Sequence, residues 1–397
     1  MRVIVHCGVI AALLLSVALA QDDYSSMLSE PNAEFAFTLY KKLSALPELQ
    51  SKNIFFSPLS ISMALSMLAL GAKGDTFNQV YMALGYARLP AQTVNEAYKH
   101  IFHMLGRSRD YMRLDVINAV AVQKGAEVMD KFMEDAKHYY ESEAISVDFS
   151  KPDVVKQEIN EYIAKHTNNT ITDMVKEVDP DTLMMLINCI YFRGEWRKYF
   201  DQDGTTKGDF QVDANTKVSV DMMRRQGSYA LYEDKDNFTT VLRLPYLGSA
   251  SMIIVMPDEG KMKEVEDSIC SHHLKHWMQA MKHDELIVHM PKYSISGKIS
   301  LKDTLVSMGV VSAFSNTANF TGMTGEKVKV SKVEHKAVLN VDEKGTEASA
   351  VTTVDFKLYG SFTPKPLKID RPFLVFITDY NTKSILFMGK ITNPAAE

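Results

Sequence analysis

The order of two periodicities along the chain constrains its fold more than any other feature. In the first part, apolar residues recur at helical steps, as at Phe35, Leu39 and Leu43, whereas strand-like patterns dominate from about residue 184. The two kinds of element do not alternate, so a doubly wound parallel sheet is not expected. Helices followed by strands are typical of an α+β fold with largely antiparallel sheets.

The second predicted helix has a clear beginning. Ser57 is placed to cap it and Pro58 to occupy its first position. The helix continues to about Leu70 and is apolar nearly all round, which predicts that it is buried. Gly71 and Gly74 are expected to end it. Weaker helical patterns cover residues 91–106, 128–142 and 151–166.

Strands are predicted throughout the second part. The continuous apolar run Leu183–Phe192 is typical of a strand covered on both faces. Further strands are expected in pairs joined by turns, with two short helices between the pairs: Val241–Pro245 with Ser251–Met256 around Leu247-Gly248, helices near Lys261–Met281, and Phe373–Ile377 with Ile385–Ile391 around Asn381-Thr382.

The beginning of the chain has the features of a signal peptide. Arg2 supplies a positive charge, Val9–Leu15 is a short apolar run, and Ala18-Leu19-Ala20 provides a small-x-small cleavage pattern. We therefore expect residues 1–20 to be removed and the product to be secreted and extracellular. No later apolar run reaches the length of a membrane span, so no membrane association is expected.

Residues 21–397 are expected to form a single domain, because no linker, repeat or low-complexity tract divides them. The net charge of -5 argues against nucleic acid as a partner, and we expect a monomer. Phosphate-loop, Gly-x-Ser-x-Gly and clustered metal-binding motifs are missing, which favours a protein that is not an enzyme and needs no metal or cofactor.

The mature chain has two cysteines, of which Cys189 is expected to be a buried free thiol, although pairing with Cys270 is an alternative. Three sequons make Asn168, Asn237 and Asn319 candidates for glycosylation.

A β-rich run, Val328–Val341, leads into a long segment over about residues 344–366, where a loop would be unusually long. Its residues divide by parity. One set carries no charge: Thr346, Ala348, Ala350, Thr352, Val354 and Phe356. The other carries every charge after Gly345: Glu347, Ser349, Val351, Thr353, Asp355 and Lys357. This division is what a half-buried strand requires, so the segment is predicted to be able to enter a sheet.

Six motifs in this order resemble those of the serpin family: Asn53–Ser60, Asn188–Trp196, His335–Leu339, Glu343–Ala350, Asp370–Phe376 and Phe387–Lys390. The resemblance covers residues 31–395, and within the family the chain looks most like alpha-1-antitrypsin and antichymotrypsin. It implies the serpin fold, with three largely antiparallel sheets, about eight to nine helices and an exposed reactive-centre loop. It also implies a suicide inhibitor that traps a serine protease as a covalent acyl complex when the cleaved loop inserts into the main sheet.

The resemblance also implies roles for particular residues. The hinge of the loop comprises Glu343, Gly345, Thr346, Glu347, Ala348, Ser349 and Ala350. A polar cluster beneath the opening strands comprises Ser57, Ser60, Asn188 and His335, for which a purely structural hydrogen-bond network is the alternative. Trp196 is expected where the hinge enters, and Lys292 opposite Glu343 as an ion pair.

Counting seventeen residues from Glu343, as in related inhibitors, places the reactive bond between Tyr359 and Gly360. Tyrosine before the bond favours chymotrypsin-like or elastase-like targets. An offset to Leu358 or Phe362 keeps that class, whereas Lys357 would indicate a trypsin-like target. The alternative function is a non-inhibitory serpin that carries a hormone or another small ligand. Such members often have bulky or charged residues at the inward hinge positions, where this chain has Thr346, Ala348 and Ala350.

Overall fold

The computed structural model describes residues 26–106, 111–346 and 364–396. Nine α-helices lie within these residues: residues 26–44, α2 (Pro58–Gly71), α3 (Gly74–Ala83), α4 (Ala91–Leu105), α5 (Asp130–Tyr140), α6 (Pro152–His166), α7 (Met262–Ser268), α8 (Ser271–Ala280) and α9 (Lys302–Ser307). The expected α+β class is confirmed. The short 3₁₀ helices are η1 (Pro47–Leu49) and η2 (Ser312–Phe314).

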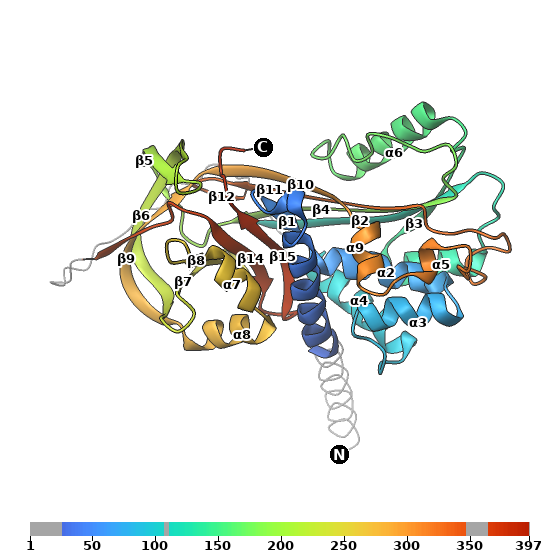
Figure 1. The fold of residues 1–397 in the computed structure, drawn as a ribbon, viewed down its shortest axis with the longest axis horizontal. Helices are drawn as coiled ribbons and strands as arrows, with labels where there is room; N and C mark the ends of the chain where they lie inside the picture. The colour runs from blue at the N-terminus through green and yellow to red at the C-terminus, as the bar shows by residue number, and fades with distance from the viewer. Residues whose placement is uncertain (1–25, 107–110, 347–363, 397) are drawn as a thin grey trace, which may run out of the picture.

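One sheet has the order β10-β11-β4-β2-β3, and its long strands run side by side along the upper part of the molecule in Figure 1. Its strands are β2 (Met112–Gln123), β3 (Glu143–Val147), β4 (Met184–Glu195), β10 (Tyr293–Ser300), β11 (Lys332–Val341) and the two-residue β12 (Gly345–Thr346), which pairs with β4. β11 and β4 run parallel from Lys332 opposite Met185 to Val338 opposite Tyr191. Helix α6 covers one face of this sheet, and α2 to α5 lie beneath the other.

The other strands form a nine-stranded network with the path β1-β15-β14-β8-β7-β6-β9-β13, and β5 joins it through β6. They are β1 (Ile54–Phe56), β5 (Asp201–Gln211), β6 (Lys217–Asp234), β7 (Thr239–Pro245), β8 (Ala250–Pro257), β9 (Lys282–Pro291), β13 (Lys365–Lys368), β14 (Phe373–Asp379) and β15 (Ser384–Ile391). The long strand β6 pairs with β5 over its first half, with β9 over Met222–Leu231 and with β7 over its last residues, so it links these strands into one network.

Helix α2 has the predicted beginning and burial. Ser57 accepts a hydrogen bond on its side chain from the backbone N–H of Ser60 (3.1 Å), and Pro58 is the first helical residue. All but one of its residues are buried. Gly71 ends the helix as expected, but the prediction for Gly74 was wrong. Ala72 is extended and the chain becomes helical again at once, so Gly74 begins α3.

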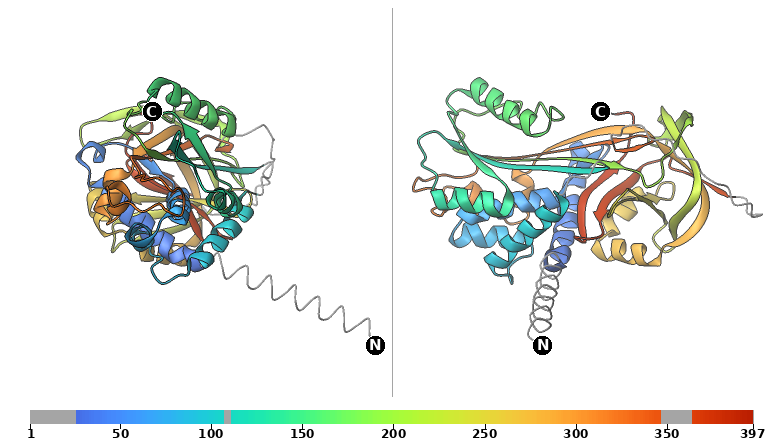
Figure 2. Two further views of the ribbon diagram at one scale, coloured as in Figure 1. Left: turned by 90° about the vertical axis from the view of Figure 1, so that its right-hand side faces the viewer. Right: turned by 180° about the vertical axis from the view of Figure 1, so that it is seen from behind.

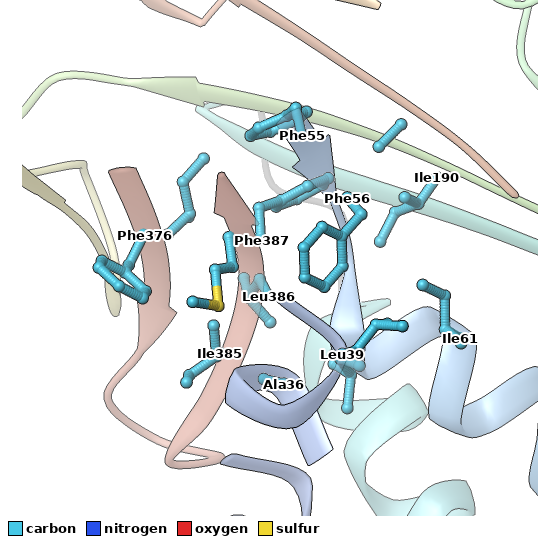
Figure 3. Packing of buried hydrophobic residues seen from close by; sticks show 14 of the residues in the cluster. Ala36, Leu39, Phe55, Phe56, Ile61, Ile190, Phe376, Ile385, Leu386 and Phe387 are labelled. Carbon is cyan, nitrogen blue, oxygen red and sulfur yellow. The ribbon is translucent and has the colours of Figure 1, made fainter. Parts of the chain in front are cut away.

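The main core lies where the two sheets meet. β1 pairs with β15 and continues directly into α2, so Phe55 and Phe56 lie between the sheets (Figure 3). Phe55 stacks on Phe387 with ring centroids 5.3 Å apart. Figure 2 shows β14 and β15 in red, between the blue N-terminal helices and the yellow α7 and α8. Ser57 is therefore held at this junction by rigid apolar packing.

Candidate functional site

The end of β11 reverses direction in a tight turn. Oδ1 of Asp342 accepts hydrogen bonds from the backbone N–H groups of Lys344 (2.9 Å) and Gly345 (3.0 Å). The backbone N–H of Asp342 donates to the carbonyl of Gly345 (2.8 Å). Because aspartate bonds to following backbone groups, it favours such reversals. The turn directs the chain back along the sheet.

After the turn, β12 lies antiparallel against the end of β4, with Gly345 opposite Glu195 and Thr346 opposite Gly194. The backbone N–H of Trp196 also donates to the carbonyl of Lys344 (2.9 Å). A Cβ atom at residue 345 would lie 2.1 Å from the carbonyl oxygen of Gly194, and φ at this residue is +150°. Only glycine fits this close approach of two backbones.

Trp196 is the side chain that holds the turn in place. Its indole is buried and stacks on Tyr246, with ring centroids 4.3 Å apart and planes inclined by 10°. Its Nε1–H donates to the carbonyl of Asp342 (3.0 Å). The structure thus places Trp196 where the expected hinge begins, with both its backbone and its indole bound to that segment.

The expected ion pair between Lys292 and Glu343 is present, with Nζ 3.1 Å from Oε2. The Glu343 side chain is only 10% exposed, and Thr205 donates to its other oxygen (2.8 Å). Burial alone would raise the pKa of Glu343, but the hydrogen bonds from Thr205 and Lys292 outweigh it and lower the pKa. The carboxylate is therefore charged at neutral pH and is held by Thr205 and Lys292 where the expected hinge begins.

The four residues of the expected polar cluster are buried together. The backbone N–H of Ser57 donates to Nε2 of His335 (3.1 Å), so the ring proton is on Nδ1 and donates to Oδ1 of Asn188 (2.5 Å). Oδ1 of Asn188 also accepts from the Ser60 hydroxyl (2.9 Å), and Nδ2 of Asn188 donates to the Ser60 carbonyl (3.2 Å). The cluster joins α2 to the sheet above it.

His335 and Asn188 lie directly opposite each other on the parallel strands β11 and β4. Burial lowers the pKa of His335 to about 3, so the imidazole is neutral at physiological pH. Because neutral imidazole both donates and accepts, it can exchange partners without creating a buried charge. The cluster therefore lies across the pair of strands that would have to separate for a new strand to enter.

Sequence reasoning missed a fifth member, Asn118. It lies on β2 opposite Asn188, and its Oδ1 accepts from Nδ2 of Asn188 (2.5 Å). Within the described residues, Nδ2 of Asn118 is buried without a hydrogen-bond partner. The signal available in the sequence was an asparagine inside the apolar run Val116–Val122.

Both ends of the expected loop, residues 344–366, are paired with neighbouring strands. Gly345 and Thr346 pair with β4, and Lys365 and Pro366 belong to β13, which pairs in parallel with β9. Strand pairing at both ends satisfies backbone groups that a free loop would leave to water. Other predictions fall outside the described residues: Glu347, Ala348, Ser349, Ala350, Leu358, Tyr359, Gly360 and Phe362, and the signal peptide over residues 1–20.

The three sequon asparagines differ in their surroundings. Asn168 is exposed, with a left-handed backbone (φ 50°). Nδ2 of Asn237 donates to Asp234 (2.8 Å), and Oδ1 of Asn319 accepts from the hydroxyl of Thr321 (2.8 Å). Asn168 is therefore the most accessible of the three for a glycan.

Cys189 is a buried free thiol as expected, and Cys270 is also free. In the part of the chain that the structure describes, no group of His, Cys, Asp or Glu side chains could hold a metal ion. None of the helices described there is long and apolar enough to cross a membrane.

The comparison with protein families decides the relationship. The family model described as Serpin (serine protease inhibitor) matches residues 30–394. The chain belongs to the serpin family. This serpin is 52% identical over 370 residues to an alpha-1-antitrypsin homolog of Cyprinus carpio, an alignment that covers 90% of this chain and 99% of the carp protein. It is 39% identical to alpha-1-antiproteinase of Callosciurus caniceps, with 92% and 88% covered.

Solved structures confirm the serpin fold. Human thyroxine-binding globulin superimposes with a TM-score of 0.90 at 36% identity, covering 94% of this serpin and all of that chain. Human glycosylated kallistatin superimposes with a TM-score of 0.86 at 35% identity, with 94% and 100% covered. The alpha-1-antitrypsin-like branch recognised from the sequence motifs is thus supported by relatives along nearly the whole chain.

Proposed function

We propose that this serpin is a secreted suicide inhibitor of chymotrypsin-like or elastase-like serine proteases. The observation that carries the proposal is β12: the hinge already pairs with the end of β4, in the direction that an entering strand would follow. Gly345 permits the close approach of its backbone to that of Gly194. Every second residue after Gly345 is uncharged up to Phe356, which suits a strand with one buried side.

In the proposed reaction the protease serine attacks the carbonyl carbon of Tyr359. The peptide bond to Gly360 breaks, an ester joins Tyr359 to the serine oxygen, and the new amino group of Gly360 takes the proton. The segment after Gly345 then enters the sheet and carries the acylated protease with it before water hydrolyses the ester. The uncleaved form is a kinetically trapped state.

In this proposal the polar cluster holds strands β11 and β4 together until the new strand enters between them. Entry of a strand between β11 and β4 would separate His335 from Asn188, whose bond is 2.5 Å in the structure. The hydroxyls of Ser57 and Ser60 and the amide of Asn118 provide replacement partners, so the opening need not leave a buried polar group unpaired. Without such partners each lost bond would cost about 1–3 kcal/mol.

A gel assay with mass spectrometry tests the proposal. Incubation with chymotrypsin should give a complex that survives denaturant, and the released C-terminal peptide should begin at Gly360. Tyr359→Arg should transfer inhibition from chymotrypsin to trypsin, because arginine suits a trypsin-like primary pocket. Cleavage without a stable complex would contradict inhibition, and a peptide with another first residue would move the reactive bond.

A carrier function is the second candidate, because one structural relative is described as a thyroxine-binding globulin complex with thyroxine. A carrier would bind hormone in a saturable way and would be cleaved by chymotrypsin without trapping it. The small hinge residues Thr346, Ala348 and Ala350 favour inhibition. Equilibrium dialysis with thyroxine, beside the gel assay, distinguishes the two functions.

We further propose that residues 1–20 direct export and that the mature monomer carries a glycan at Asn168. The signal-like start and the exposed sequon support this. N-terminal sequencing of protein secreted by eukaryotic cells should begin at Gln21, and glycosidase treatment should reduce its mass.

A further inference from the structure

A cavity of about 390 Å³ is lined by residues at and near the ends of several strands, none of which belongs to the polar cluster. Its walls come from the end of α4, the start of β2, the segment after β4, and the turns that follow β7 and β14. Small-molecule sites usually measure about 300–1,000 Å³, so this volume suits one compact ligand.

Two arginines, Arg197 and Arg243, line the cavity. Arg243 extends from β7, and its Nε is buried without a hydrogen-bond partner within the described residues. Neither arginine forms an ion pair with any carboxylate in the part of the chain that the structure describes. Buried guanidinium nitrogens are rarely left without a hydrogen-bond partner. We therefore expect a ligand in the cavity to accept a hydrogen bond from Arg243, and an anion would accept the strongest one.

The carboxylate of Asp379, which precedes the lining residue Tyr380, already has hydrogen-bond partners. Asp379 accepts hydrogen bonds from the hydroxyl of Ser249 and from the backbone N–H (2.7 Å) and hydroxyl (2.9 Å) of Thr382. Its carboxylate therefore fixes the turn after β14 and makes no ion pair with Arg197 or Arg243.

The remaining walls combine apolar and neutral polar groups. Met104, Met112 and Pro245 are apolar residues of the lining, and Ser251 and Asn381 add residues that can form hydrogen bonds. A bare inorganic ion would leave the methionine walls without contacts. An acid with an aromatic or short aliphatic body would satisfy both the guanidinium groups and the apolar walls.

We propose that this cavity binds a small organic acid, with its anionic group at Arg243 and Arg197 and its apolar body against Met104 and Met112. This inference goes beyond protease inhibition and does not depend on it. Neither the hinge residues nor the polar cluster of Ser57, Ser60, Asn118, Asn188 and His335 contributes to the walls.

A fluorescence titration of the native full chain with 1-anilinonaphthalene-8-sulfonate tests the proposal. The probe should bind at one saturable site, and Arg243→Gln should weaken this binding at least tenfold. Arg224→Gln, a control on the neighbouring strand β6 and outside the cavity, should change it less than twofold. The proposal is overturned if the probe does not saturate one site or binds Arg243→Gln as tightly as the unaltered protein.

An uncharged probe separates recognition of charge from general apolar binding. N-phenyl-1-naphthylamine has the same rings without the sulfonate and should bind at least tenfold more weakly. If it binds as tightly as the sulfonate, the guanidinium groups do not select an anion and the proposal is wrong.

A second variant locates the site should Arg243→Gln fail to fold. Ser251→Leu adds bulk from β8 while both arginines remain, so it should abolish sulfonate binding at an unchanged melting temperature. Undiminished binding to a folded Ser251→Leu protein would place the probe elsewhere and overturn the proposal.

Discussion

The imidazole of His335 is fully buried and has a pKa of about 3, against 6.5 for an exposed histidine. Below pH 6.5 His335 is therefore protonated in the unfolded chain, whereas in the folded chain it stays neutral down to about pH 3. Stability should fall as pH drops from 6.5 towards 3, by about 1.4 kcal/mol for each pH unit well below 6.5, and this residue should contribute no pH dependence above 6.5. His335→Gln should remove this contribution.

Urea unfolding of the two proteins at pH 7, 6, 5 and 4 checks the prediction. His272→Gln is the matched control, because His272 is exposed and its replacement should leave the slope in place. Identical pH slopes for the unaltered protein and His335→Gln would show that the buried imidazole is not the source.

Gly345 provides a second prediction at the scale of one residue. Gly345→Ala should displace β12 from β4, because the new Cβ would lie 2.1 Å from the Gly194 carbonyl oxygen and 2.9 Å from the Trp196 nitrogen. The expected loss of stability is about 1–3 kcal/mol. Since the chain has two tryptophans, Trp196 can be observed alone in a Trp277→Phe background, where its emission should shift to the red.

Gly260→Ala controls for backbone strain alone. Gly260 also has a positive φ (+75°), but a Cβ atom added there would have nothing within 4 Å. Emission should stay unchanged in this control. An unchanged spectrum in Gly345→Ala would contradict the close approach of the two backbones.

At the scale of the element, β12 and the segment after it should behave as a strand with one buried side. Thr346→Arg places a charge in the uncharged set of alternate residues, which would face the core after insertion. Burying this charge would cost several kcal/mol, so insertion should slow. Chymotrypsin should still cut the loop but be released active. Ser349→Arg, on the charged parity, is the matched control and should trap protease normally. An unaltered stoichiometry of inhibition by Thr346→Arg would reject insertion.

Elements with strong local signals were predicted well from the sequence. Ser57-Pro58 provides a cap and a first helical residue, and Leu183–Phe192 is an apolar run that became the central strand β4. β6 was not predicted, because its exposed and buried residues do not alternate regularly where it passes between partners. The close approach at Gly345 could not be predicted either, since it depends on Gly194, far away in the chain.

The residues of the candidate site also differ in whether they could be predicted from the sequence. Ser57, Ser60, Asn188 and His335 were recognised from family motifs, whereas Asn118 was missed because it lies in a strand without such a motif. The cavity with Arg197 and Arg243 was also beyond sequence reasoning. Its walls come from separate segments whose proximity is set by tertiary packing alone.

For the whole molecule, cleavage between Gly345 and Pro366 should raise heat stability. A new central strand could add on the order of ten hydrogen bonds of roughly 0.5–1.5 kcal/mol each, so the melting temperature should rise by at least about 10 °C. Differential scanning calorimetry before and after limited proteolysis measures the change. Cleaved Thr346→Arg should show little rise, and an unchanged melting temperature in the cleaved native protein would contradict the mechanism.

The parallel pairing of β11 with β4 gives the sheet a further property. A strand that continued from β12 between them would run antiparallel to both, because β12 is antiparallel to β4. One slanted parallel ladder would then be replaced by two perpendicular antiparallel ladders, which are slightly more stable per residue. Under the proposed mechanism, the gain in ladder stability at this pair of strands would contribute to the free energy that carries the acylated protease along with the inserting segment.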